Sequence, residues 1–251
     1  MPLDDSPFRF SFDTDGVLEE AGAPEESSSA FWWLDSGGRL IIRGLRGETM
    51  QGDAGPTDAW RIRYAIGNPR DTDQGVHPQN IFRLVTRAEW KDARIRALFF
   101  VTKDNLSASP NRNSSNGVLL MSRYTDAGQT LYYTGVRVDG TAVIKKKYRG
   151  TYYTLAQGKI FPGTYRGDRD DTNLIPHDTW LSLQSESVTQ PDGSVRVSLF
   201  MRDIGKTQWT ELLSTVDSGQ YAGTPPLGSG RAGIRTDFMD VSFDSFRIEP
   251  L

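Results

Sequence analysis

The sequence of 251 residues contains no cysteine and only two histidines. Without cysteine the chain has no disulfide, no catalytic thiolate and no Cys-ligated zinc. His77 and His177 lie far apart in the sequence, without the short spacing of a metal-ligand pair, so a catalytic zinc site is not expected. The missing cysteines do not fix the cellular compartment, because exported proteins can lack them as well.

An excess of basic residues is also missing. Lysine and arginine number 29 against 32 aspartates and glutamates, which gives a formal net charge of −3. Proteins that bind duplex DNA generally carry a marked positive excess that neutralises phosphates. Nucleic acid is therefore not an expected partner.

Long hydrophobic runs are absent. No segment approaches the roughly 18 consecutive apolar residues that indicate a membrane-spanning helix. The first residues, MPLDDSPFRF, show neither the basic nor the apolar region of a signal peptide. We expect no membrane insertion, and the sequence shows no export signal.

The sequence does contain many short runs that alternate or are apolar, separated by clusters of Gly, Asp, Asn and Pro, whereas helical periodicity is almost absent. This pattern predicts an all-β protein, a two-sheet antiparallel sandwich or a barrel. Long turn-rich segments occur, but none separates two patterned halves, so a single domain over 1–251 is expected. The expected strands are 38–44, 59–66, 80–87, 93–101, 117–124, 131–139, 141–148, 151–157, 179–187, 194–202, 232–237 and 241–249.

The stretch VDGTAVIKKKYRGTYYT (138–154) combines three lysines with three tyrosines. Asp139-Gly140 predicts a two-residue type I′ turn, and Arg149-Gly150 predicts a second one. The two turns would place Tyr133, Lys146 and Tyr153 in one cross-strand row. The same face would carry Arg137 and Tyr148, and the reverse face, with Val136, Val138 and Val143, would pack in the core. The alternative is that the lysines keep a solvated edge strand from pairing with other chains.

The order NIFRLVTR, ARIRALFFV, GVLLMSRY, YYTGVRVDG and GRAGIRTDFMDVSFDSFRIE resembles the concanavalin A-like lectin/glucanase superfamily, with its laminin-G-like and polysaccharide-lyase members. The resemblance implies a jelly roll of two antiparallel sheets, one of them concave with a glycan groove. It also implies that the opening FRFSFDTDG pairs with the closing FDSF strand. From this resemblance we expect a polysaccharide or oligosaccharide partner, no organic cofactor, and a secreted or periplasmic location.

Lyase members of this superfamily hold an Arg/Glu strand, a Gln/His strand and a Tyr/Lys strand around one groove. Similar residues here are Arg43 and Glu48 in RGLRGE, then His77 and Gln79 in HPQ, then the strand from Tyr132 to Asp139. The order His-x-Gln reverses the usual one, and Arg137 stands where a tyrosine is usual. The glucanase signature of two glutamates flanking an aspartate is missing.

These observations favour a polysaccharide lyase that cleaves a uronate-containing glycan by β-elimination. Lysine and arginine would hold the uronate carboxylate, while tyrosine, lysine or histidine would move the protons. Two alternatives remain open: a noncatalytic glycan-binding module, and a glycoside hydrolase that uses an acid pair among Glu48, Asp139 and other groove carboxylates. The expected catalytic residues are Tyr133, Lys146, His77 and Arg137, and the expected substrate-binding residues are Arg43, Glu48, Gln79, Tyr148 and Tyr153.

A structural calcium ion is a further expectation from the resemblance. Asp13 and Asp15 in FDTDG and Asp244 in FDSF would come together where the terminal strands pair. Carboxylate and carbonyl oxygens are the ligands that calcium prefers. The alternative is that these aspartates form turns and caps.

Overall fold

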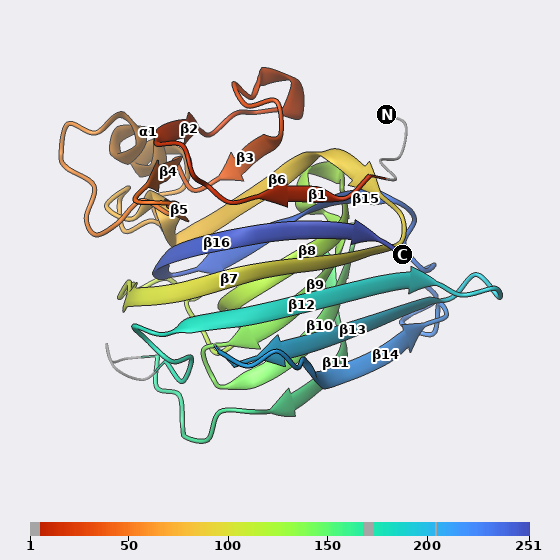
Figure 1. Cartoon of the computed structure of the whole chain (residues 1–251). Helices are drawn as coiled ribbons and strands as arrows, with labels where there is room; N and C mark the ends of the chain where they lie inside the picture. Colours follow the sequence, from red (N-terminus) through yellow and green to blue (C-terminus); the bar gives the residue numbers. More distant parts are fainter. Residues whose placement is uncertain (1–5, 168–172, 204) are drawn as a thin grey trace.

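The computed structural model describes residues 6–167, 173–203 and 205–251 as two antiparallel sheets packed face to face. Figure 1 shows one sheet in front, with β16, β7, β12, β13 and β14 side by side, and the other behind it. The predicted two-sheet sandwich is therefore confirmed.

The front sheet, sheet A, contains nine strands. The opening strand pairs with the closing one, as the sequence predicted: Phe8 lies opposite Ile248 and Phe10 opposite Phe246. In spatial order the strands are β14 (Thr210–Asp217), β13 (Val195–Arg202), β12 (Trp180–Thr189), β7 (Ala93–Asp104), β16 (Met239–Pro250), β5 (Arg46–Glu48), β4 (Arg39–Arg43) and β2 (Gly16–Glu19), with β1 (Phe8–Phe10) paired to β16.

The other sheet, sheet B, contains seven strands. It includes the lysine stretch, which lies near one edge. In spatial order the strands are β11 (Thr151–Lys159), β10 (Thr141–Tyr148), β9 (Thr130–Arg137), β8 (Gly117–Thr125), β15 (Gly230–Asp237), β6 (Ile81–Trp90) and β3 (Trp32–Ser36).

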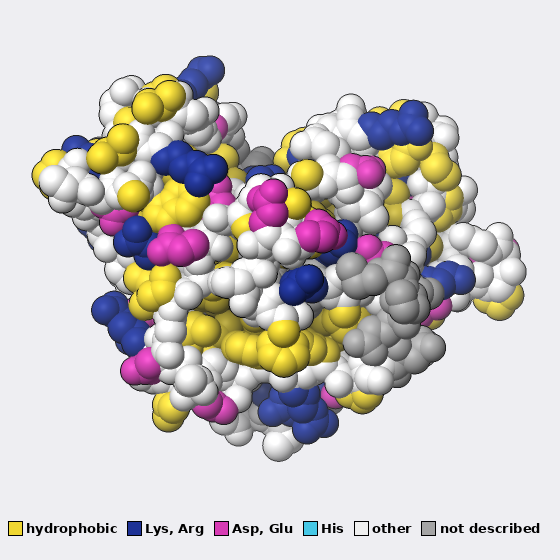
Figure 2. Space-filling model, turned by 90° about the horizontal axis from the view of Figure 1, so that it is seen from above, with side chains coloured by type: hydrophobic (Ala, Val, Ile, Leu, Met, Phe, Trp, Pro, Cys, Tyr) yellow, Lys and Arg dark blue, Asp and Glu magenta, His cyan; other side chains and the backbone are white. Residues whose placement is uncertain are grey.

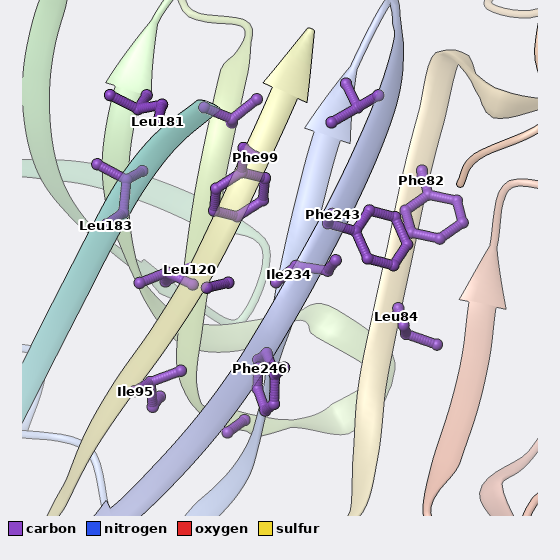
Figure 3. Close-up of a cluster of buried hydrophobic side chains, with 14 of the residues drawn as sticks. Phe82, Leu84, Ile95, Phe99, Leu120, Leu181, Leu183, Ile234, Phe243 and Phe246 are labelled. Atoms are coloured by element: carbon purple, nitrogen blue, oxygen red, sulfur yellow. The ribbon is translucent and has the colours of Figure 1, made fainter. Parts of the chain in front are cut away.

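The core lies between the two sheets and follows from the period of two along each strand. In β7, Ala93, Ile95, Ala97, Phe99 and Val101 are buried while the residues between them are partly exposed. Figure 3 shows how side chains of β7, β12 and β16 meet side chains of β6, β8 and β15. Fully buried aromatic rings such as Phe82 and Phe243, with ring centroids 5.6 Å apart, join the sheets.

One predicted strand is wrong. Residues 59–66 form a helix, α1 (Ala59–Gly67), although their apolar and polar residues alternate as in a strand. Asp58 caps this helix by accepting a hydrogen bond from the backbone N–H of Trp60. Trp60 and Tyr64, four residues apart, pack together on its inner side, while Ile66 is exposed. Short 3₁₀ turns occur at Pro24–Glu26, Pro78–Asn80 and Asp126–Gly128.

The hairpin between β9 and β10 differs from the prediction by one residue. Its loop contains three residues, Val138 to Gly140, and only Gly140, at φ +75°, takes the left-handed conformation that a type I′ turn requires at two positions. Lys145 therefore lies opposite Tyr133, and Lys146 lies opposite Tyr132. Because side chains alternate between faces, this shift of one residue turns Lys146 toward the core.

The hairpin between β10 and β11 is as predicted. Arg149 and Gly150 both have positive φ, and Lys146 lies opposite Tyr153. A bulge after Ile144 then shifts the register of these two strands.

The surface carries charges of both signs. Viewed from above, basic and acidic side chains lie next to one another, and the outline rises in two lobes with a hollow between them (Figure 2). None of the described helices has the length and hydrophobicity of a membrane span.

Candidate functional site

The outer face of sheet B is recessed. Leu119 and Met121 face away from sheet A, since they alternate with the core residues Val118 and Leu120, yet both are at most 6% exposed. A cavity of about 450 Å³ opens on this face. Its lining includes Tyr133, Lys145, Tyr152, Arg235, Asp237, Leu119, Val143 and the asparagines Asn111, Asn113 and Asn116. We call it the sheet B pocket.

Two tyrosine rings and an arginine form the centre of the sheet B pocket. Tyr133 of β9 stacks on Tyr152 of β11, with centroids 6.2 Å apart and an interplanar angle of 19°. Arg235 of β15 donates through Nη1 to the hydroxyl of Tyr133 at 3.0 Å and through Nε to Oδ1 of Asp237 at 2.7 Å. Burial opposes the charge of Arg235, but Asp237 and the two phenols raise its pKa well above the ordinary value. The guanidinium is therefore a fixed positive charge.

The two phenols respond to this charge differently. Burial raises the pKa of Tyr133, and the nearby Arg235 only partly offsets that effect. Tyr152 is 49% exposed. Burial acts to raise its pKa as well, but the charges and hydrogen bonds of Arg235 and Lys147 outweigh burial and lower the pKa below its ordinary value. Tyr152 is thus the more acidic phenol of the pair, and it is the one that solvent or a ligand can reach.

Lys145 supplies a second cation at the edge of the two rings. Burial lowers its pKa, and the positive charge of Arg137 lowers it further, while Tyr152 and Asp237 act in the opposite direction. The ammonium group of Lys145 is therefore more acidic than that of an ordinary lysine, and it lies in the same site as a phenol that is also more acidic than usual. Groups whose pKa values depart from the ordinary ones are common in catalytic sites.

The loop between β7 and β8 forms one wall of the sheet B pocket. It belongs to the turn-rich segment SASPNRNSSN, and Asn116 accepts from the backbone N–H of Asn113 at 2.7 Å. Arg137 holds this loop by donating through Nε to the carbonyl of Ser114 at 2.9 Å, and it pairs with Asp139 at 3.1 Å. Arg137 thus lies on the predicted face, but in contact with the wall of the pocket instead of lining it.

Lys146 does not lie in this pocket. It is fully buried on the core side, where its Nζ pairs with Oδ2 of Asp217 at 2.7 Å and donates to the carbonyls of Thr224 and Pro225. The predicted row of Tyr133 with Lys146 is wrong because of the longer hairpin loop.

Two neighbours follow Lys146 to its face. Tyr153 lies directly opposite it, and the ring of Tyr148 lies 5.8 Å from its Nζ. Val143, predicted for the core, instead lines the sheet B pocket. The groove placement of Tyr148 and Tyr153 is therefore also wrong.

Both histidines line a second cavity, of about 570 Å³, together with Asp53, Asp104 and Asp178. Each ring nitrogen of His77 faces a carboxylate, with Nδ1 at 2.8 Å from Asp73 and Nε2 at 3.0 Å from Asp53. A hydrogen bond to Asp104 raises the pKa of His177. His77 is thus separated from the phenol pair and already engaged by two carboxylates.

The remaining substrate-binding candidates belong to sheet A or its loops. Gln79 is fully buried and donates to the carbonyl of Gly52 and to Oδ1 of Asp240. Glu48 is 2% exposed and accepts from Arg43 at 2.6 Å and Arg46 at 2.9 Å. The structure therefore does not bring Arg43, Glu48 or Gln79 to the sheet B pocket.

Asp13, Asp15 and Asp244, the predicted calcium ligands, differ in burial. Within residues 6–167, 173–203 and 205–251, no group of three or more histidines and carboxylates is arranged to hold a metal. Asp13 and Asp15 are exposed, whereas Oδ1 of Asp244 is buried and has no hydrogen-bond partner among the described residues. Such an oxygen suits a calcium ligand, and backbone carbonyls would have to supply further oxygen ligands to the ion. Calcium at Asp13, Asp15 and Asp244 stays a prediction.

Most of the residues that meet in the sheet B pocket were not predicted from the sequence. Lys145 and Tyr152 belong to the stretch 138–154, but the predicted two-residue turn placed them in other rows. Arg235 and Asp237 lie on the face of β15 opposite the apolar core residues Ala232 and Ile234. That alternation marks one polar and one apolar face, and it was a usable signal for the polar side of this strand.

Comparison with known proteins identifies the fold. No family model matches the sequence, and no curated protein matches it. Among solved structures, the chain is similar to the carbohydrate-binding module CBM66 from Bacillus subtilis, with a TM-score of 0.54 and 11% identity over 87% of this chain and 94% of that one.

Two further structures show a similar degree of likeness. A prokaryotic β-1,3-1,4-glucanase (lichenase) from a mouse hindgut metagenome has a TM-score of 0.51 and 9% identity over 98% of this chain and 100% of that one. The GH43 protein BlXynB from Bacillus licheniformis has a TM-score of 0.51 and 12% identity over 97% of this chain but only 39% of its own. The chain therefore has the concanavalin A-like jelly-roll fold that the sequence resemblance implied.

Proposed function

We propose that the protein is a polysaccharide lyase that cleaves an acidic, uronate-containing glycan by β-elimination in the sheet B pocket. The observation that carries the proposal is the exposed phenol of Tyr152, whose pKa Arg235 and Lys147 lower, next to the ammonium group of Lys145. The fold supports a carbohydrate ligand, because the similar structures include a carbohydrate-binding module and a lichenase.

The carboxylates of the sheet B pocket favour elimination over hydrolysis. Glycoside hydrolases generally use two carboxyl groups on either side of the scissile bond. The described lining of this pocket includes one carboxylate, Asp237, which is 3% exposed and bound to Arg235 at 2.7 Å. Neither Glu48 nor Asp139 is part of the lining. The acid pair that a hydrolase would require is thus not assembled here.

Each step of β-elimination has a residue to carry it. Lys145 pairs with the uronate carboxylate and stabilises the negative charge that develops when the adjacent carbon loses its proton. The phenolate of Tyr152 accepts that proton, a carbon–carbon double bond forms, and the bond to the leaving glycosidic oxygen breaks. The leaving oxygen takes a proton, which the protonated Tyr152 can return. Arg235 is a positioning residue that holds Tyr133 and keeps Tyr152 acidic.

The test is a panel of alginate, glucuronan, pectate and glycosaminoglycans, with the unsaturated uronate product followed by ultraviolet absorbance. Tyr152→Phe removes the hydroxyl but keeps the stacked ring, and we expect it to lower kcat by about 10²- to 10⁴-fold, the usual contribution of a proton-transfer residue. Tyr153→Phe is the matched control, since this neighbour lies on the other face of β11.

The outcomes separate the alternatives. Product formation that Tyr152→Phe abolishes and Tyr153→Phe leaves intact supports the proposal. Binding of a uronate polymer without unsaturated product would instead indicate a noncatalytic module that uses the same cations. Release of reducing ends from neutral glycans, without the double bond, would indicate hydrolysis and contradict the proposal.

A further inference from the structure

The outer face of sheet A holds two neighbouring cross-strand rows with opposite charge patterns. In one row Glu249, Arg94 and Glu186 alternate, and Arg94 pairs with Glu186 at 2.6 Å and with Glu249 at 3.2 Å. In the next row the residues directly opposite one another are Arg9, Arg247 and Arg96. Like charges directly opposite each other destabilise a sheet. The second row is therefore electrostatically unfavourable as it stands.

A fourth arginine completes this cluster. Arg202, at the end of β13, lies 4.8 Å above the ring of Trp209, and Arg96 lies 5.4 Å from the same ring. A cavity of about 250 Å³ lies between these side chains, and it is lined by Arg96, Arg202, Arg247, Trp209, Ser182, Ser245, Ala97 and Leu98. Nε of Arg202 is buried and has no hydrogen-bond partner among the described residues. A buried donor without an acceptor is costly unless a ligand supplies one.

Negative charge near the arginine cluster is insufficient to balance it. Glu249 accepts from Arg96 at 3.2 Å, but it is shared with Arg94. The side chain of Asp244 is on the same face of β16 as Arg247 and is hydrogen-bonded by Ser245. Within the described part of the chain, Arg202, Arg247 and Arg9 form no ion pair. Burial lowers the pKa of Arg96; Glu249 raises it, but repulsion from Arg94, Arg202 and Arg247 acts with burial, so the pKa stays below its ordinary value.

We propose that this arginine cavity on sheet A is a second glycan-binding site, which holds a carboxylate or sulfate group of an acidic polysaccharide. Guanidinium groups bind such oxyanions with paired hydrogen bonds, and three of them line the cavity. The choice of an acidic glycan rests on the proposed function. The site lies on the sheet opposite the sheet B pocket, so it would retain a polymer on the protein without occupying the site of cleavage.

The experiment measures binding in a protein whose sheet B pocket is disabled by Tyr152→Phe and Lys145→Met. Calorimetry with an oligouronate, a sulfated oligosaccharide, a neutral oligosaccharide and inorganic sulfate gives the affinity for each probe. We expect Arg202→Gln with Arg247→Gln to weaken binding of an acidic oligosaccharide at least tenfold. The control is Arg63→Gln with Arg70→Gln, which removes the same charge from two exposed arginines in and after helix α1, away from this cavity.

A second readout separates a binding role from a structural one. Because Arg247 faces Arg9 and Arg96, Arg247→Gln should leave the melting temperature without ligand unchanged or raise it. Equal affinity in the Arg202/Arg247 variant and the control would overturn the inference, as would binding of inorganic sulfate with no acidic oligosaccharide bound. If the wild type binds at this site but forms no unsaturated product, the lyase proposal fails and the second site stands.

Discussion

Two clusters of lysine and tyrosine lie on opposite faces of the same strand. On the core side, Lys146 pairs with Asp217, whose Oδ2 also accepts from the hydroxyl of Tyr132 at 2.6 Å. On the pocket side, Lys145 lies near Tyr133 and Tyr152 without an ion pair among the described residues. Burial raises the pKa of Tyr132 to a value far above the ordinary one, whereas the pKa of Tyr152 is lowered.

The difference shows that residue type alone does not decide a role. The core cluster is closed: its cation, its anion and its phenol satisfy one another, so little remains to bind a ligand. The pocket cluster has excess positive charge, which a bound carboxylate would balance. A functional site is therefore indicated by charges that the protein leaves uncompensated and accessible.

The largest expected effect comes from breaking the core cluster. Lys146→Met leaves the carboxylate of Asp217 buried without its cation, and we expect it to lower the free energy of unfolding by about 3–5 kcal/mol. Lys145→Met on the other face should change it by less than about 1 kcal/mol. Denaturant unfolding of the two variants measures the contrast.

A double variant sharpens this result. Lys146→Met with Asp217→Leu removes both charges and should recover most of the stability lost in the single variant. Similar losses for Lys145→Met and Lys146→Met would contradict the assignment of the two lysines to opposite faces.

The sequence was sufficient for the fold because the fold depends on many strands with a clear alternation. In β7 and β16 the apolar residues alone indicate which side faces the core. The site depends on register, which a single loop residue changes, and Asp139-Gly140 does not reveal that Val138 also belongs to the loop. Helix α1 was missed because its alternating residues read as a strand and only one local signal, the capping residue Asp58, indicates a helix. The packing of Trp60 with Met50 and Ala54 is a tertiary contact that the local sequence does not show.

The next effect concerns turnover and its pH dependence. Tyr152 acts deprotonated, and its pKa lies below the ordinary value, so kcat/KM should rise with pH and level off below the ordinary tyrosine pKa of about 10. Lys145 acts protonated, and its pKa is also lowered, so activity should fall again at higher pH. Lys145→Met should reduce kcat/KM by about 10²-fold without a comparable loss of stability.

The conservative variant distinguishes a charge from a structural contribution. Lys145→Arg keeps a positive charge of higher pKa, so it should retain part of the activity and move the falling limb of the pH profile upward. A falling limb that stays in place would show that another group controls it.

The smallest effect tests the loop that separates the two clusters. Gly140 has φ +75°, and a Cβ added there would lie 2.3 Å from the backbone carbonyl oxygen of Phe161. Gly140→Ala should therefore lower the free energy of unfolding by about 1–2 kcal/mol, which is more than the positive φ alone would cost. Gly150→Ala in the other hairpin is the matched control: its φ is +87°, but the nearest atom is a flexible oxygen of Gln129 at 3.2 Å. A two-residue turn at Asp139-Gly140 would require positive φ at Asp139. If Asp139→Gly raised the free energy of unfolding, that result would favour the two-residue turn, which places Lys146 instead of Lys145 beside Tyr133.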